Sequence, residues 1–90
     1  MGKGGALAFI RHLAIENAHR GVTANPLALG LMEMVDIHDP ELVKGMERTI
    51  PAGRLGTGDD IGPACVWLAS NEANWVTGQT IHVNGGSLTT

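Results

Sequence analysis

Residues 21–30 read GVTANPLALG, a mostly apolar run between two glycines. Short apolar runs that are bounded by turn residues and carry β-branched residues are typical of strands buried on both faces. The run therefore predicts a strand over Val22–Leu29, which Gly30 ends. Pro26 weakens this prediction, because proline cannot donate a hydrogen bond to a sheet ladder.

The segment before this strand has the spacing of an amphipathic helix. Between Gly4 and Arg20, apolar residues recur at three and four positions, namely Ala6, Phe9, Ile10, Leu13 and Ala14. Gly21 follows, and a residue without Cβ can adopt the left-handed conformation that ends many helices. We expect one helix over Gly4–Arg20.

A second helix is predicted after the strand. Asp39 can accept a hydrogen bond from the first turn, and Pro40 suits the first helical position. We expect this helix to run to about Thr49 and to stop at Pro51. The segment between Leu31 and His38 is predicted to be irregular or weakly helical.

A glycine-rich loop over residues 51–58 precedes a third predicted helix, whose apolar face is Ile61, Ala64, Cys65 and Leu68. If Asp59 or Asp60 is the N-cap, Pro63 falls in the first turn, where its missing N–H is not needed. If Thr57 is the N-cap, the proline costs a backbone hydrogen bond. We favour Asp59 or Asp60. A second strand is predicted over Thr80–Val83.

The predicted order is helix, strand, two helices, strand. Strands joined by a helical crossover are typical of a parallel α/β sheet. Two strands alone would leave both edges of the pair open and its faces partly uncovered. The chain therefore reads as part of a larger sheet.

Composition excludes several functional classes. The chain has 90 residues, enough for one domain at most, and a formal net charge of −3, with six scattered Lys and Arg residues. Such a surface does not favour nucleic acid, and no apolar run approaches the length of a membrane span. Cys65 is the sole cysteine, which fits a reducing compartment, so we expect a cytoplasmic protein in which Cys65 is a small buried residue.

The remaining candidate side chains have structural interpretations. The four histidines, His12, His19, His38 and His82, show no metal-ligand spacing, so no metal site is predicted. We interpret Trp67 and Trp75 as packing anchors. The glycines at 53, 56 and 58 look like a dinucleotide-binding loop, but they follow a helix and a proline rather than a strand, which argues against phosphate binding.

Several motifs follow one another along the whole chain: Lys3-Gly4-Gly5-Ala6-Leu7 with Leu13-Ala14-Ile15-Glu16; Gly21-Val22-Thr23-Ala24-Asn25 ending at Gly30; Arg54-Leu55-Gly56 with Asp59-Asp60-Ile61; Trp67-Leu68-Ala69-Ser70; and Thr77-Gly78-Gln79 with Val83-Asn84-Gly85-Gly86. In this order they resemble the C-terminal portion of the short-chain dehydrogenase/reductase family, and are similar to its 3-oxoacyl-carrier-protein reductase and glucose dehydrogenase branch. The resemblance implies that residues 1–90 form the C-terminal part of a Rossmann-type doubly wound parallel sheet.

The resemblance also implies a site. Lys3 matches the lysine of the family's Y-x-x-x-K motif, which lowers the pKa of the catalytic tyrosine and bonds the nicotinamide ribose of NAD or NADP. Leu29 and Gly30 match the segment that shapes the nicotinamide pocket, although the family has proline where Leu29 stands. Met32 and Met34 lie where the family has a mobile substrate lid. The sequence contains no tyrosine, and by this spacing the tyrosine would lie two places ahead of Met1.

Three functional hypotheses follow. The first is an inactive fragment of an NAD(P)-dependent oxidoreductase. The second is a non-catalytic module that self-associates. The third is a piece that rebuilds an enzyme with a separate N-terminal half. The family commonly forms tetramers through the helix that matches Gly4–Arg20, so the resemblance implies a homodimer or homotetramer. No tightly bound cofactor is expected on this chain alone.

Overall fold

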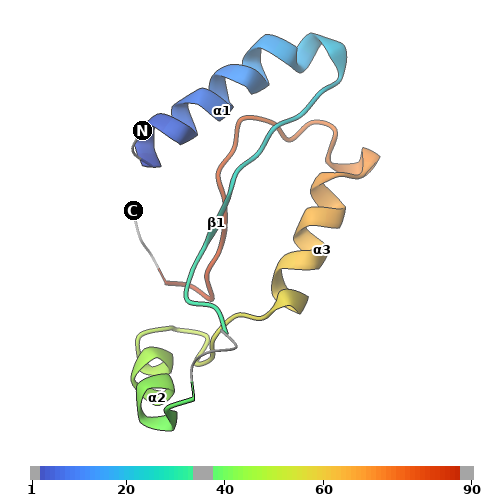
Figure 1. The fold of residues 1–90 in the computed structure, drawn as a ribbon. Helices are drawn as coiled ribbons and strands as arrows, with labels where there is room; N and C mark the ends of the chain where they lie inside the picture. Colours follow the sequence, from blue (N-terminus) through green and yellow to red (C-terminus); the bar gives the residue numbers. More distant parts are fainter. Residues whose placement is uncertain (1–2, 34–37, 88–90) are drawn as a thin grey trace. The chain divides into compact units, whose positions relative to one another are not determined.

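A computed structural model describes residues 3–33 and 38–87 (Figure 1). The chain divides into two compact units, one of Met1–Leu27 with Pro63–Ile81 and the other of Ala28–Gly62 with His82–Thr90. Its elements, in order, are the helix α1 (Lys3–Asn17), the 3-10 turn η1 (Ala18–Arg20), the strand β1 (Leu27–Leu29), the helices α2 (Pro40–Arg48) and α3 (Gly58–Leu68), the 3-10 turn η2 (Asn71–Ala73) and the strand β2 (Ile81–Val83). The predicted order of helices and strands is confirmed.

The first helix agrees with its prediction, except that its last turn tightens into η1. Gly21 ends it with φ +75°, a left-handed conformation, and its N–H donates to the carbonyl of Ala18 at 3.0 Å. Ala14 is buried on the inner face of α1. A Cβ placed on Gly78 would lie 3.7 Å from the Ala14 Cβ, so α1 packs closely on the turn before β2.

The two strands pair as a parallel sheet, in which Ile81 N–H donates to Pro26 C=O at 2.9 Å and Gly30 N–H donates to Val83 C=O at 3.0 Å. The prediction of a strand over Val22–Leu29 is too long, because β1 begins only after Pro26. Before the proline, one backbone hydrogen bond joins the two segments, from Gly78 N–H to Ala24 C=O at 2.9 Å, and the Asn25 side chain adds two more. Its amide donates to Val76 C=O at 2.9 Å and accepts from Gln79 N–H at 3.0 Å.

The second helix begins as predicted. The Asp39 carboxylate accepts the N–H of Glu41 at 3.0 Å, and Pro40 occupies the first helical position. The helix ends before Pro51. Ile50 just beyond it is 4 % exposed and lies under Gly85, where a Cβ would come within 2.9 Å of the Ile50 Cγ2.

The predicted start of the third helix is wrong. α3 begins at Gly58, so Thr57 precedes the helix and Pro63 lies in its interior. The physical reason is visible at the first turn: the Asp60 carboxylate reaches back to the N–H of Thr57 at 2.8 Å, as the third residue of a capping box does. The prediction placed Asp59 or Asp60 before the helix. Instead both lie in its first turn, and the Asp60 carboxylate accepts the N–H of Thr57, the residue before the helix.

Burial is sparse in the part of the chain that the structure describes. Its buried hydrophobic residues are Ala14, Ile50 and Ala73, whereas Trp75 is 95 % exposed. Cys65 and Trp67 are exposed as well, so the predictions of a buried cysteine and of tryptophan packing anchors are wrong within this chain. They rested on average burial, which assumes that a residue's packing partners belong to the same chain.

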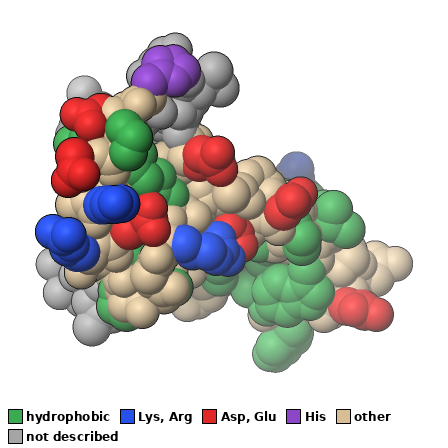
Figure 2. All heavy atoms as spheres, turned by 90° about the horizontal axis from the view of Figure 1, so that it is seen from below, with side chains coloured by type: hydrophobic (Ala, Val, Ile, Leu, Met, Phe, Trp, Pro, Cys, Tyr) green, Lys and Arg blue, Asp and Glu red, His purple; other side chains and the backbone are tan. Residues whose placement is uncertain are grey.

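Charge is mixed on the face drawn in Figure 2, where Lys and Arg side chains lie among Asp and Glu side chains. No described helix has both the length and the apolar character that crossing a membrane requires.

Candidate functional site

The candidate site lies in the second unit, where β1 and β2 both end. Gly30, Leu31 and Met32 follow β1, and Asn84 and Gly85 follow β2. In open parallel sheets, ligands bind in the crevice outside the carboxyl ends of the strands. We call residues 30–32 and 84–85 the carboxyl edge, and this edge is the candidate binding site.

The two strand ends approach each other too closely for a side chain at position 30. A Cβ on Gly30 would lie 2.8 Å from both the Cα and the Cβ of Asn84. Asn84 then fixes the turn that follows, because its Oδ1 accepts the N–H of Gly86 at 3.0 Å and its Nδ2 donates to Ser87 C=O at 2.7 Å. Gly30 is thus required by backbone packing at this edge.

The segment after β1 is held by a second parallel bridge, between Met32 and Gly56. Gly56 N–H donates to Leu31 C=O at 3.0 Å, and Glu33 N–H donates to Gly56 C=O at 2.7 Å. The Met32 side chain lies over Gly56, where a Cβ would come within 2.7 Å of the Met32 Sδ. Gly56 of the 51–58 loop is therefore the backbone hydrogen-bond partner of the segment after β1.

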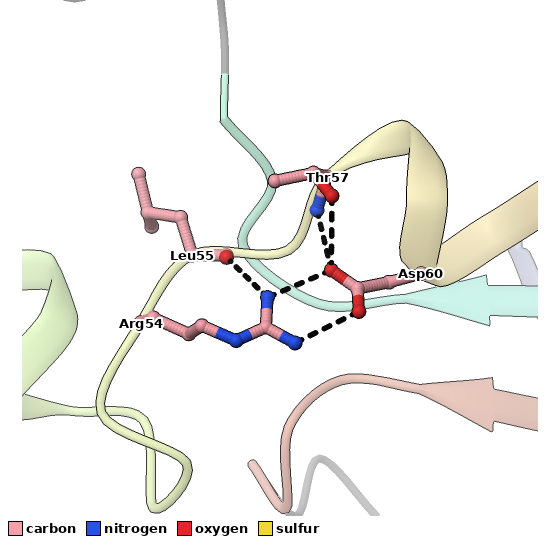
Figure 3. A network of polar contacts seen from close by, with 4 residues as sticks. All are labelled: Arg54, Leu55, Thr57 and Asp60. Carbon is pink, nitrogen blue, oxygen red and sulfur yellow. Dashed lines mark hydrogen bonds and ion pairs between the residues drawn. The ribbon is translucent and has the colours of Figure 1, made fainter.

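An ion pair closes the same loop (Figure 3). Arg54 Nη1 and Nη2 donate to the two carboxylate oxygens of Asp60, each at 2.8 Å, and Nη1 also donates to Leu55 C=O at 3.1 Å. The hydrogen bond from Arg54, followed by that from the Thr57 N–H, holds the pKa of Asp60 well below its usual range. The same contact raises the pKa of Arg54. Both groups therefore stay charged at neutral pH.

These groups line a cavity of about 110 Å³. Its walls combine apolar side chains with an arginine, a carboxylate and an amide, and consist of Leu31, Met32, Ala52, Arg54, Gly56, Asp60, Val83, Asn84 and Gly85. Pockets for whole small molecules are typically about 300–1,000 Å³. The cavity can hold one ring-sized end of a ligand and is too small for a dinucleotide.

The glycines at 53, 56 and 58 do not form a phosphate cradle. Gly56 is engaged in the bridge to Met32, and the N-terminus of α3 faces its own Asp60 carboxylate, with Asp59 beside it. Negative charge at that position repels an anion. The loop connects α2 to α3.

The chain was compared with protein-family models, curated proteins and solved structures. The family model described as enoyl-(acyl-carrier-protein) reductase matches residues 1–87. The chain belongs to the short-chain dehydrogenase/reductase family. The resemblance predicted from the motifs is thereby confirmed.

Curated relatives of this dehydrogenase/reductase chain include the 3-oxoacyl-(acyl-carrier-protein) reductase FabG of Haemophilus influenzae, 43 % identical over 86 residues, which cover 93 % of this chain and 36 % of the relative. Nodulation protein G of Rhizobium sp. strain N33 is 44 % identical over 86 residues, 93 % of this chain and 35 % of the relative. The chain thus spans about a third of the length of these relatives.

A solved structure, that of the NADPH-dependent reductase YwfH involved in bacilysin biosynthesis, superposes with a TM-score of 0.87 at 24 % identity. The match covers 97 % of this chain and 38 % of that one. At this identity the match establishes the fold, a part of the Rossmann-type dehydrogenase/reductase sheet.

The residues expected from the family do not all belong to the second unit. Gly30 and Met32 lie together at the carboxyl edge, and Leu29 is 48 % exposed at the end of β1. Met34 lies outside the described residues. Lys3 is the first residue of α1, in the other unit, and its side chain is not described.

Two lining residues, Arg54 and Asp60, received no role from the sequence. Both stand in the motif that resembles the family, six positions apart across a loop. A spacing of six carries no periodic signal, since only i, i+3 and i, i+4 pairs meet on a helix. Among residues 3–33 and 38–87, no three His, Cys, Asp or Glu side chains converge as metal ligands would.

Proposed function

We propose that this chain forms the C-terminal, substrate-side part of an NAD(P)-dependent oxidoreductase that interconverts a carbonyl and an alcohol by hydride transfer. The observation that carries the proposal is the 43 % identity with a 3-oxoacyl-(acyl-carrier-protein) reductase over 93 % of the chain. Family membership alone would leave the reaction open, because one fold hosts many activities.

NAD(P)H would supply the hydride. Leu29 and Gly30 match the segment that shapes the nicotinamide pocket in the family. They do not line the cavity of about 110 Å³, which begins at the next residues of the chain, Leu31 and Met32. Met32 and Met34 would face the substrate, where flexible thioether side chains adapt to varied apolar groups. The pyrophosphate and adenosine would lie on polypeptide outside these 90 residues, since the local glycine loop faces two carboxylates.

Proton transfer would need a second part of the enzyme. A phenol with an ordinary pKa of about 10 must be shifted by a nearby cation before it can exchange protons at neutral pH. Lys3 is the cation expected by resemblance, but the 90 residues contain no tyrosine for it to act on. We therefore expect the chain alone to be inactive, and we infer a cytoplasmic location from its lone cysteine.

A second candidate function is a non-catalytic module that self-associates as a dimer or tetramer. Its support is exposed apolar side chains: Ile15 on α1 is 69 % exposed and Val66 on α3 is 71 % exposed. Single exposed apolar side chains are ordinary on a protein surface, whereas contiguous apolar patches mark surfaces that pack on other protein. A missing N-terminal half would cover them equally well.

Titration with NADPH and NADH, followed by tryptophan fluorescence, tests the first proposal. We expect no saturable response from the chain alone, and ketone-dependent NADPH oxidation once a dehydrogenase/reductase N-terminal half is added. Tight binding by the chain alone would contradict the division of the site described above. Light scattering separates the second candidate, since a monomer at all concentrations is incompatible with self-association.

A further inference from the structure

We propose that the Arg54–Asp60 ion pair is a positioning device for the segment that follows β1, acting through the two peptide groups on either side of Gly56. The functional importance of that segment rests on the proposed oxidoreductase activity. The mechanical connection does not, because it consists of contacts within the second unit.

The ion pair holds the outer side of both peptide groups. Arg54 Nη1 donates to the carbonyl of Leu55, which belongs to the peptide group before Gly56. Asp60 Oδ2 accepts the N–H of Thr57, which belongs to the peptide group after Gly56, and it accepts the Thr57 hydroxyl at 3.2 Å. Because the guanidinium and the carboxylate are joined by two hydrogen bonds, the two peptide groups share one anchor.

The segment after β1 holds the inner side of the same two peptide groups. The N–H of the first donates to Leu31 C=O, and the C=O of the second accepts Glu33 N–H. A trans peptide group is planar and rigid, with its N–H and C=O pointing in opposite directions. Rotation of either group at the ion pair must therefore move a hydrogen-bond partner in the segment 31–33.

The Met32 side chain packs tightly against Gly56. The space where its side chain would stand is filled by the Met32 Sδ and methyl group, 2.7 and 3.0 Å from an added Cβ. Met32 in turn lines the cavity at the carboxyl edge. Arg54 and Asp60 thus set where Met32 lies.

Backbone amide exchange, measured by NMR on the 90-residue chain without cofactor, tests the proposal. Arg54→Gln removes the anchor but keeps the contact between Asp60 and Thr57. We expect severalfold faster exchange at the Glu33 N–H and a shifted Met32 methyl signal. The Gly78 N–H, which donates to Ala24 C=O in the first unit, should be unchanged. The control Arg48→Gln removes the same charge from an exposed residue of α2 and should leave both readouts as in the wild type.

The double variant Arg54→Asp with Asp60→Arg keeps an opposite-charge pair but loses both contacts with the peptide groups, because a carboxylate at position 54 cannot donate to Leu55 C=O and a guanidinium at position 60 cannot accept the Thr57 N–H. The Glu33 N–H should therefore exchange at least as fast in the double variant as in Arg54→Gln, and wild-type protection there would overturn the proposal. Unchanged exchange at Glu33 in Arg54→Gln would overturn the proposal. So would a wild-type chain in which the Glu33 N–H exchanges as fast as an unstructured amide. Failure to bind cofactor with a complementing half, while the Glu33 result holds, would instead reject the oxidoreductase function.

Discussion

Replacing Gly30 with alanine should destabilise the chain, because this position lies against the backbone of the neighbouring strand end. The added Cβ would stand 2.8 Å from the Cα and Cβ of Asn84, closer than carbon atoms approach in folded proteins. Neither atom can move without shifting the end of β2, since Val83 C=O accepts the Gly30 N–H. The two strand ends would have to separate.

The magnitude follows from two opposing effects. Overpacking a tight contact typically costs about 1–3 kcal/mol. Alanine also restricts the unfolded chain, which contributes about 0.4–1 kcal/mol in favour of folding when the native conformation suits it. We therefore expect the free energy of unfolding to fall by roughly 1–2 kcal/mol in Gly30→Ala.

Gly45→Ala is the matched control. Gly45 lies in the interior of α2, and an added Cβ would meet nothing within 4 Å. Alanine in a helix interior is favoured over glycine by about 0.5–1 kcal/mol, so this variant should be more stable than the wild type. Urea unfolding followed by far-ultraviolet circular dichroism measures both variants. Equal stability of the two alanine variants would refute the argument from the close approach.

Two further predictions concern polar contacts. Asn25→Ala removes the hydrogen bonds to Val76 C=O and from Gln79 N–H and should cost about 2 kcal/mol in urea unfolding, at roughly 1 kcal/mol per bond. Asn25→Asp keeps only the acceptor, so its free energy of unfolding should lie between those of the wild type and Asn25→Ala. A loss of stability in Asn25→Asp as large as that in Asn25→Ala would contradict the assignment of about half of the loss to each bond. For Asp60, whose pKa is lowered in the folded chain, the stabilising contribution is present above the unfolded pKa of about 3.9 and is lost as the pH falls through the folded pKa. The stability difference between the wild type and Asp60→Asn should therefore be constant from about pH 8 to pH 5 and shrink only below about pH 4; a difference that disappears near neutral pH would disprove the assignment.

The sequence predicted those parts of the fold that depend on local signals. The end of the first helix at Gly21 and the cap at Asp39 are each decided by one residue and its neighbours, and both predictions are confirmed. The predicted starts of β1 and α3 were wrong. At β1, Asn25 bonds to groups more than fifty positions away, which the sequence does not reveal. At α3, Thr57 and Asp60 have the spacing of three that a capping box requires, a local signal that the prediction overlooked.

The neighbours of the predicted site residues depend on packing between segments that are far apart in the sequence. Gly30 and Met32 were identified by resemblance, and the structure gives each a neighbour, Asn84 and Gly56, that spacing could not have indicated. Contacts across 24 or 54 positions depend on how the loops close. Periodicity reports only which residues share a face of one element.

The carboxyl edge and the apolar faces place opposite demands on this chain. The edge is specified internally, by glycines that admit backbone contact and by charged hydrogen bonds within one loop. The apolar surface is not, because side chains as large as Trp75 find no cover among the described residues. Small domains already bury the lowest share of their surface. We therefore expect the carboxyl edge to keep its geometry in the 90-residue chain, and we propose that further protein covers the exposed apolar side chains.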